Sequence, residues 1–181
     1  MRITGGSWAS RRVAGPARGT PLRPTPDALR EQAFAVLGPR LPGAAFLDLF
    51  AGTGVNSLEA LSRGAAKAFL VERAPAAAAL IRRNFAALTV AEARWELEVR
   101  EAVRALRALA GRGVSCTLAW CDPPFASWND GVEALELARE LSVLAAGAEA
   151  VLEAPPRSEP HVTGFSVVRE LRGAFLLRVE V

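Results

Sequence analysis

The tetrapeptide Asp122-Pro123-Pro124-Phe125 has the residue types needed to hold a flat base that carries an exocyclic amino group. Such an amine is a poor nucleophile because its lone pair is delocalised into the ring. The Asp122 carboxylate and the Pro123 carbonyl can each accept one N–H and turn the lone pair towards an electrophile, from a backbone that two prolines make rigid. Phe125 offers a face for stacking an extruded base. The alternative is a Pro-Pro loop after a buried strand, without chemistry.

A second motif upstream indicates a nucleoside-containing cofactor. Residues 46–54 form an apolar strand that runs into an acidic, glycine-rich turn, in which Gly52 and Gly54 permit a close approach of the backbone. The third glycine of a dinucleotide fingerprint is missing, because position 57 is Ser. The Asp48 carboxylate would repel a pyrophosphate but can attract the ammonium group of a methionine moiety, directly or through water. The two motifs together predict methyl transfer from S-adenosylmethionine to a nucleobase nitrogen.

Further cofactor contacts are expected where the next two strands end. Glu72 has two oxygens that suit both ribose hydroxyls, a role common to folds that bind NAD and folds that bind S-adenosylmethionine. Arg73 could then flank the adenine, and Glu101 could accept from its amino group. The alternative for the acidic residues is a plain strand-terminal or helix-initial position. The predicted cofactor-binding residues are Asp48, Phe50, Gly52, Thr53, Gly54, Asn56, Glu72, Arg73, Glu101 and Ala102.

Alternating strands and helices must position both motifs. Strands are predicted over 45–49, 68–72, 95–99, 117–121 and 149–153, helices over 55–63, 75–88, 102–110 and 131–144, and a closing antiparallel hairpin over 166–170 and 174–181. This pattern predicts an α/β fold with a doubly wound, mainly parallel seven-stranded sheet, as in class I methyltransferases. In such a sheet, ligands bind over the carboxyl ends of the strands, where both motifs lie.

The N-terminal region has a different composition from the rest. Residues 1–40 carry seven arginines and two acidic residues, whereas the remaining chain is slightly acidic. We predict a β-hairpin with a Gly5-Gly6 turn and a helix from Pro26 to Leu37, so that residues 1–40 dock RNA and residues 41–181 form the methyltransferase domain. The alternative is a solvated basic tail. The predicted RNA contacts are Arg2, Arg11, Arg12, Arg18, Arg23 and Arg30.

The cysteines, the single histidine and the lengths of the apolar runs disfavour several other classes of function. Cys116 and Cys121 flank one predicted buried strand and are expected to be structural thiols, and no Cys/His pattern proposes a metal site. The single histidine, His161, is expected in a solvated loop, which disfavours histidine-based acid–base chemistry. No run of apolar residues reaches the ~20 of a membrane span, and no signal peptide is apparent, so a cytoplasmic monomer is expected.

With these motifs the sequence resembles the RsmD family of bacterial 16S rRNA (guanine(966)-N2)-methyltransferases. The resemblance rests on residues 2–6, 23–27 with Arg30-Glu31, 47–54, 58–65 and 122–125, and it covers nearly the whole chain. It implies S-adenosylmethionine as cofactor and a guanine of small-subunit rRNA, free or in a small-subunit particle, as substrate. Three alternatives stay open: an enzyme of this fold acting on adenine N6 or a protein glutamine, a non-catalytic RNA-binding or assembly factor, and an NAD-dependent oxidoreductase.

Overall fold

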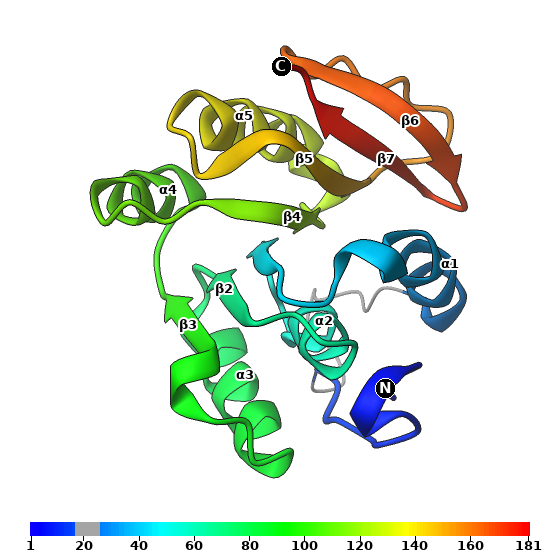
Figure 1. The fold of residues 1–181 in the computed structure, drawn as a ribbon, viewed down its shortest axis with the longest axis vertical. Helices are drawn as coiled ribbons and strands as arrows, with labels where there is room; N and C mark the ends of the chain where they lie inside the picture. The colour runs from blue at the N-terminus through cyan, green and yellow to red at the C-terminus, as the bar shows by residue number, and fades with distance from the viewer. Residues whose placement is uncertain (17–25) are drawn as a thin grey trace.

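The structure of the protein is a computed structural model that describes residues 1–16 and 26–181. Within these residues one seven-stranded sheet has the order β3-β2-β1-β4-β5-β7-β6 (Figure 1). Strands β1 to β5 are parallel, and β7 pairs antiparallel with both β5 and β6. The strands are β1 Ala45–Leu49, β2 Lys67–Val71, β3 Trp95–Glu98, β4 Cys116–Cys121, β5 Leu144–Glu153, β6 Phe165–Leu171 and β7 Ala174–Val179.

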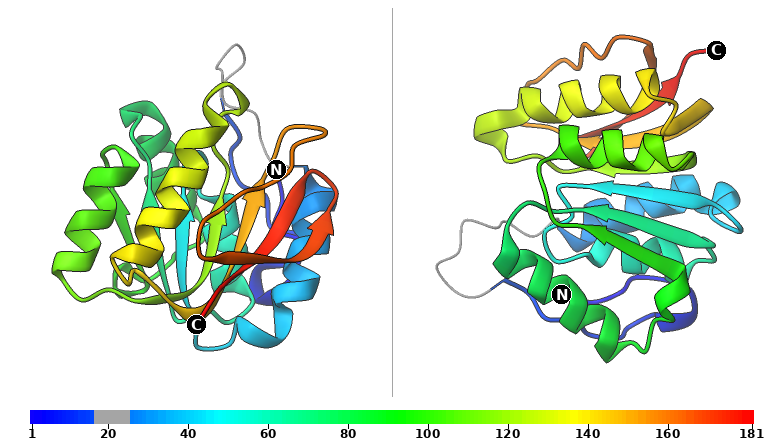
Figure 2. Two further views of the ribbon diagram at one scale, coloured as in Figure 1. Left: turned by 90° about the horizontal axis from the view of Figure 1, so that it is seen from above. Right: turned by 90° about the vertical axis from the view of Figure 1, so that its left-hand side faces the viewer.

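Helices cover both faces of the sheet, as expected for strands that are buried on both sides. One face packs against α1 (Asp27–Leu37), α2 (Val55–Ser62) and α3 (Pro75–Ala87). The other packs against α4 (Ala102–Gly111) and α5 (Trp128–Glu140), which lie side by side (Figure 2). Side chains along β1 contribute to the hydrophobic core on both faces of the sheet. Phe46 faces the first group of helices, whereas Leu47 and Leu49 face the second.

The predicted elements are present, with differences at some of their ends. The helix predicted over 131–144 spans Trp128–Glu140 instead, and β5 begins at Leu144 rather than at 149. Ser142 between them has a φ of 58°, a left-handed conformation that cannot continue a helix. The early part of β5 bulges against β4, so the pairing shifts from Cys116↔Leu144 to Leu118↔Glu149.

The N-terminal segment runs back on itself as predicted, but without the predicted Gly-Gly turn. Arg2 and Arg12 form a single antiparallel bridge, and a 3₁₀-helix over Gly6–Trp8 connects the two arms. Gly6 has a φ of 77°, and a β-carbon there would lie 2.7 Å from the amide nitrogen of Arg63 and closer still to the Ser62 carbonyl. The turn is therefore wider than a two-residue hairpin because it is fitted to the end of α2.

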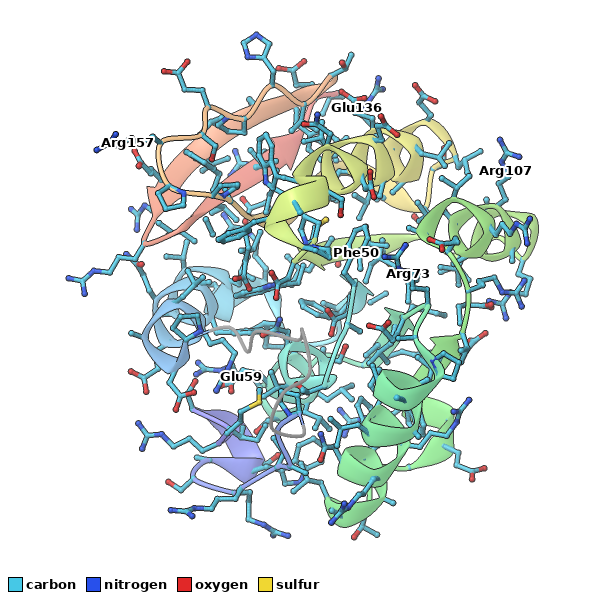
Figure 3. The ribbon with its side chains drawn as sticks, turned by 180° about the vertical axis from the view of Figure 1, so that it is seen from behind. Phe50, Glu59, Arg73, Arg107, Glu136 and Arg157 are labelled. Atoms are coloured by element: carbon cyan, nitrogen blue, oxygen red, sulfur yellow. The ribbon has the colours of Figure 1, made fainter. Side chains whose placement is uncertain are left out.

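Glu59 on α2 fixes this segment to the sheet domain. Its carboxylate is fully buried and accepts from the Thr4 N–H (2.7 Å), the Thr4 hydroxyl (2.7 Å) and Arg63 Nε (2.8 Å). Figure 3 shows Glu59 between α2 and the N-terminal segment. Ile3 and Val13 from the segment join the same hydrophobic core as Phe34 of α1. Residues 1–16 are thus packed into the body of the protein.

Asn84 on α3 joins the same segment to the glycine-rich turn. Its Nδ2 donates to the carbonyls of Ala14 (3.1 Å) and Thr53 (2.9 Å), and its Oδ1 accepts from the Ala14 N–H (2.9 Å). The side chain is buried, so these bonds are protected from water. One amide group therefore holds both the N-terminal segment and the turn that follows β1.

Candidate active site

A cavity of about 780 Å³ lies at the carboxyl edge of the sheet, where β1 and β4 end next to each other. This is the position that a doubly wound sheet predicts for a ligand. The glycine-rich turn after β1 and the loop after β4 both line it, so the structure brings the two sequence motifs together. The lining residues are Pro16, Pro26, Leu29, Phe50, Ala51, Gly52, Thr53, Val55, Asn56, Asp122, Pro123, Pro124, Phe125, Ala126, Glu153, Ala154, Pro156, Arg172 and Gly173.

The loop after β4 is held by its neighbours on both sides. The Asp122 N–H donates to the Leu49 carbonyl (3.3 Å), which continues the β1–β4 pairing past the end of the strand. Pro123 is buried against Gly131 of α5, where an added β-carbon would lie 2.5 Å from Pro123 Cγ. Phe125 is 43% exposed and lines the cavity. Asp122 and Phe125 are therefore presented to the cavity by a fixed backbone.

The glycine-rich turn has a backbone shape that explains its composition. Phe50, Gly52 and Gly54 all have positive φ, at 60°, 56° and 73°. This conformation costs a bulky residue such as Phe50 of the order of 1–3 kcal/mol, and strain of this kind is concentrated at functional sites. At Gly54 a β-carbon would also come within 3.0 Å of the Phe85 ring. The turn brings its main chain to the cavity wall, which suits the close approach of a cofactor.

Glu72, Arg73 and Glu101 lie beyond the cavity lining, near the ends of β2 and β3. Glu72 is buried, and its two oxygens accept from the N–H groups of Gly52 (2.9 Å) and Ala74 (2.7 Å). Arg73 and Glu101 are exposed and pair with each other at 3.4 Å. Phe50 and Arg73 can be located in Figure 3. Glu72 thus shapes the glycine-rich turn, and its part in binding a ribose stays a prediction.

Asp48 is 1% exposed and is not part of the cavity lining. Its Oδ2 accepts from the Ser57 N–H (3.1 Å) and hydroxyl (2.6 Å). Burial raises the pKa of Asp48 to about 7 from its ordinary 3.8, although the Ser57 hydrogen bonds oppose the rise. Its Oδ1 and the Oδ1 of Asn56 are buried and have no hydrogen-bond partner among the described residues. Asn56 lines the cavity, so its unpaired acceptor fits a cofactor that carries hydrogen-bond donors, whereas Asp48 lies behind the lining.

Glu153, at the end of β5, is a cavity residue that the sequence analysis missed. It is 5% exposed, and its Oε1 accepts from the indole N–H of Trp120 (3.0 Å). A second indole, that of Trp128, donates to the Glu153 carbonyl (2.9 Å). The signal that could have found it is an acidic residue ending the strand that follows the Asp122 strand. Arg172, in the β6–β7 turn, was missed in the same way and brings a cation to the cavity wall.

Both cysteines are free and buried, as predicted. Burial raises the pKa of Cys121 well above its ordinary value, and the nearby carboxylates of Asp122, Asp48 and Glu153 add to the rise. Burial likewise raises the pKa of Cys116 to about 12. Neither thiol is therefore a nucleophile at neutral pH.

The predicted RNA-binding arginines fall into four groups. Arg11 and Arg12 are exposed and form no ion pair within the described residues, whereas Arg2 pairs with Asp27 (3.4 Å) and Glu31 (3.3 Å). Arg30 is completely buried, and its Nη2 donates to the Arg2 carbonyl (2.6 Å) and to Asp27 (2.9 Å). That burial leaves Arg30 no surface for a phosphate contact. Arg18 and Arg23 lie outside the described residues.

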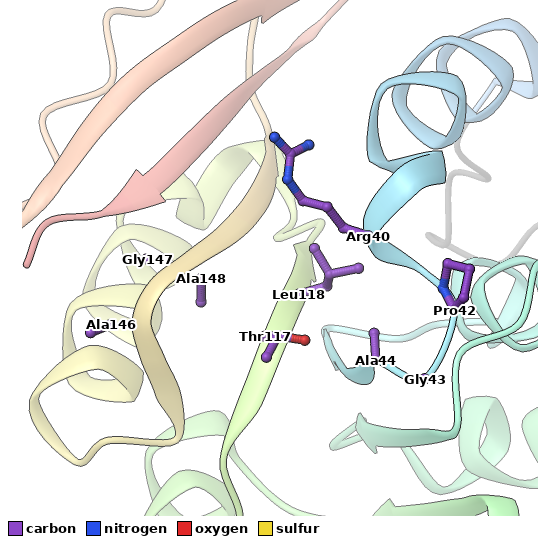
Figure 4. A pocket seen from close by; sticks show the side chains of 9 residues that line it. All are labelled: Arg40, Pro42, Gly43, Ala44, Thr117, Leu118, Ala146, Gly147 and Ala148. Carbon is purple, nitrogen blue, oxygen red and sulfur yellow. The ribbon is translucent and has the colours of Figure 1, made fainter.

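A second hollow of about 380 Å³ lies at the opposite edge of the sheet, beside the bulge in β5 (Figure 4). Its lining is mostly small and apolar, and its one charged residue, Arg40, is paired with Glu149 (3.1 Å). It has no group suited to catalysis. Within residues 1–16 and 26–181 no cluster of three potential metal ligands is present. The helices in this part of the chain are too short or too polar to cross a membrane.

Comparison with solved structures confirms the predicted fold class. A hypothetical protein of Thermus thermophilus, TTHA0928, is 30% identical with a TM-score of 0.80, covering 100% of this chain and 99% of that one. SMU.776, solved in complex with SAH, shares the fold alone, at 15% identity and a TM-score of 0.67 over 83% of this chain and 49% of that one. A putative methyltransferase of Escherichia coli, yhhF, is 30% identical with a TM-score of 0.81 over 99% of this chain and 98% of that one, so the sheet is that of class I methyltransferases.

Sequence comparison gives the family. Ribosomal RNA small subunit methyltransferase D of Escherichia coli (strain K12) is 40% identical over 126 residues, or 69% of this chain. The matched region spans 60% of that relative's length. A family model described as Conserved hypothetical protein 95 matches residues 1–174, nearly the whole chain. The chain therefore belongs to this family, the RsmD family that its motifs resemble.

Proposed function

We propose that this protein transfers a methyl group from S-adenosylmethionine to the exocyclic N2 of a guanine in 16S rRNA. The observation that carries the proposal is one cavity lined both by the glycine-rich turn and by Asp122 to Phe125. A turn that binds the cofactor and a loop that accepts hydrogen bonds from the amine, both in one cavity, can hold S-adenosylmethionine and the guanine next to each other. The small-subunit rRNA methyltransferase of Escherichia coli, 40% identical over the matched region, supports RNA as the substrate.

The residues around the turn after β1 fit the cofactor. We infer that the main chain of Gly52 to Gly54 lies along it, with Asp48 and Asn56 accepting from its polar groups and Glu72 near its ribose. The SAH bound to SMU.776, which has the same fold, supports this assignment. S-adenosylmethionine supplies an electrophilic methyl group. The buried acceptor oxygens of Asp48 and Asn56, which have no partner among the described residues, support a ligand that carries donors.

The loop after β4 prepares the amine. Asp122 and the Pro123 carbonyl accept its two N–H groups, so that its lone pair is directed away from the ring. As the nitrogen takes the methyl group, the bond between that methyl and the sulfonium sulfur breaks and the demethylated cofactor leaves as a thioether. The Asp122 carboxylate would stabilise the positive charge on the nitrogen until one N–H proton is lost to solvent. Phe125 stacks on the base, and the buried Pro123 keeps the acceptors in place without reorganisation.

The test is to incubate the protein with unmodified small-subunit RNA, free or assembled with its proteins, and labelled S-adenosylmethionine. Nuclease digestion and chromatography then identify the methylated nucleoside. N2-methylguanosine is the expected product. Label recovered as N6-methyladenosine would show an adenine enzyme of the same fold, and failure to bind the cofactor in calorimetry would reject methyl transfer altogether.

The basic N-terminal segment is proposed to dock the RNA backbone, and Arg11 and Arg12 allow a selective test. Replacing both by alanine is expected to weaken RNA binding and to lower the log–log salt slope of the affinity by roughly 0.7–0.9 for each phosphate that the variant no longer neutralises. Cofactor affinity should not change. Fluorescence titration of labelled RNA between low and moderate salt measures the slope.

A matched control removes the same charge elsewhere. Arg104 and Arg107 are exposed on α4, which covers the other face of the sheet, and their replacement by alanine should leave the slope unchanged. If both double variants show the same salt slope of RNA affinity, the N-terminal segment is not a specific RNA contact but an ordinary basic surface. Deleting the segment is a poorer test, because Ile3 and Val13 are part of the core and Glu59 would lose its Thr4 partner.

A further inference from the structure

We propose that Glu153 is the residue that selects guanine, by accepting a hydrogen bond from the N1–H of the base. This inference rests on the proposed function and extends it from the reacting amine to the rest of the base edge. Guanine presents its N1–H donor directly beside its 2-amino group. An enzyme that forms hydrogen bonds only with the 2-amino group would not distinguish guanine from a purine that lacks the N1–H donor.

The sheet register places Glu153 next to Asp122. Cys121 of β4 pairs with Leu152 of β5, so the residues that follow them, Asp122 and Glu153, lie side by side at neighbouring strand ends. Neighbouring strands are about 4.8 Å apart, a spacing from which two carboxylates can converge on adjacent donors of one purine. Both residues line the cavity. Asp122 can thus receive the 2-amino group while Glu153 receives N1–H.

Buried contacts fix the direction of the Glu153 side chain. Its Oε1 is held by the indole N–H of Trp120 at 3.0 Å, and Trp120 is completely buried and stacked on Phe34 with ring centroids 5.3 Å apart. The indole of Trp128 fixes the main chain of the same residue. An acceptor restrained in this way is preorganised to read a base edge, since little freedom is lost when the base arrives.

The chemistry of the two purines explains the selection. The N1 of guanine is a donor, whereas the N1 of adenine, and of 2,6-diaminopurine, is an acceptor whose lone pair would face the carboxylate. An ionised glutamate offers only acceptors. A site that leaves its buried polar group facing another acceptor rejects the wrong ligand strongly, because neither group regains the hydrogen bond that it had in water.

A purely structural role for Glu153 would be to satisfy the Trp120 indole. Glutamine distinguishes the two roles, because its carbonyl can keep the Trp120 hydrogen bond while its amide nitrogen introduces a donor. The Glu153→Gln variant is therefore expected to fold and to bind S-adenosylmethionine like the wild type. Its discrimination between bases should change.

The experiment uses two synthetic small-subunit RNA fragments that differ only at the target position, guanosine in one and 2,6-diaminopurine riboside in the other. Both carry the 2-amino group that accepts the methyl. We expect the wild type to favour guanosine in kcat/KM by about 10- to 100-fold, the usual value of one base-edge contact, and Glu153→Gln to reduce that preference to a few-fold. The ratio is measured on one preparation, so it does not depend on the fraction of folded protein.

Glu149→Gln is the matched control, because Glu149 is a second buried glutamate on β5 that pairs with Arg40 and Arg178 at the far edge of the sheet. It should keep the wild-type ratio. The inference is overturned if the wild type itself does not discriminate, or if Glu153→Gln slows both substrates equally. A wild-type protein that methylates neither fragment would instead reject the proposed function, and this is seen before any variant is compared.

Discussion

Replacing Asp122 by alanine is expected to lower kcat for methyl transfer by about 10²–10³, the usual effect of removing one preorganised polar group from a transition state. The Asp122 N–H stays bonded to the Leu49 carbonyl whatever the side chain, so the loop should keep its position. Cofactor affinity should change little, because the carboxylate acts mainly on the amine as it gains charge. Single-turnover rates at saturating RNA and cofactor measure the effect.

Asparagine at the same position separates geometry from charge. Asp122→Asn keeps an acceptor oxygen but loses the negative charge, and we expect its rate to be well above that of the alanine variant. Asp130→Ala removes an exposed carboxylate from the first turn of α5 and should leave the rate unchanged. Wild-type rates in both Asp122 variants would contradict a catalytic role and show that residues 122–125 only connect β4 to α5.

Replacing Asp48 by asparagine is expected to stabilise the folded protein at pH 8 by up to about 4 kcal/mol while weakening cofactor binding. Burial raises the pKa of Asp48 to about 7, whereas in the unfolded chain it is near 3.8. Below pH 3.8 both states are protonated and the carboxyl group has no effect on stability. Between pH 3.8 and 7 only the unfolded state loses its proton, so the wild type becomes progressively less stable as pH rises.

The measurement is the free energy of unfolding in urea at pH 4, 6 and 8. The stability gained by Asp48→Asn should be small at pH 4, increase through pH 6 and level off above pH 7. The exposed Asp130→Asn variant should show no such rise. Calorimetry at pH 8 should show S-adenosylmethionine binding more weakly to Asp48→Asn by about 1.5–3 kcal/mol, the worth of a bond to a charged group. A stability gain that does not depend on pH would contradict the burial argument.

Most of the fold could be predicted because its strands are short apolar runs that end in acidic or glycine-rich turns. The β1 strand is present as predicted. The helix α2 behind it ends one residue early and could be predicted because Gly54 and Gly64 flank it. The stretch from Leu141 to Leu144 was misassigned to a helix, because a short apolar run has no decisive period. The left-handed conformation of Ser142, which ends the helix there, cannot be read from the residue types.

The parts of the candidate site that consist of residues adjacent in the sequence could be predicted. The parts that depend on burial in the folded protein could not. The Asp122 and Gly52 motifs can be read along the chain, and they do meet in the cavity. The sequence does not show that Asp48 is buried and hydrogen-bonded to Ser57. It does not show the burial of Arg30 either. Glu153 was missed because its position beside Asp122 depends on the pairing of β4 with β5.

The order of strands also determines how far apart along the chain the two halves of the site lie. The turn after β1 is hydrogen-bonded to Val71 and Glu72 at the end of β2, twenty residues along the chain. The loop after β4 reaches the turn only when β1 pairs with a strand some seventy residues away. Closing so long a segment has an entropic penalty that local pairing avoids, so distant strands join late. We therefore expect a partly folded chain to acquire its cofactor turn first, and methyl transfer to appear only once β4 has paired with β1.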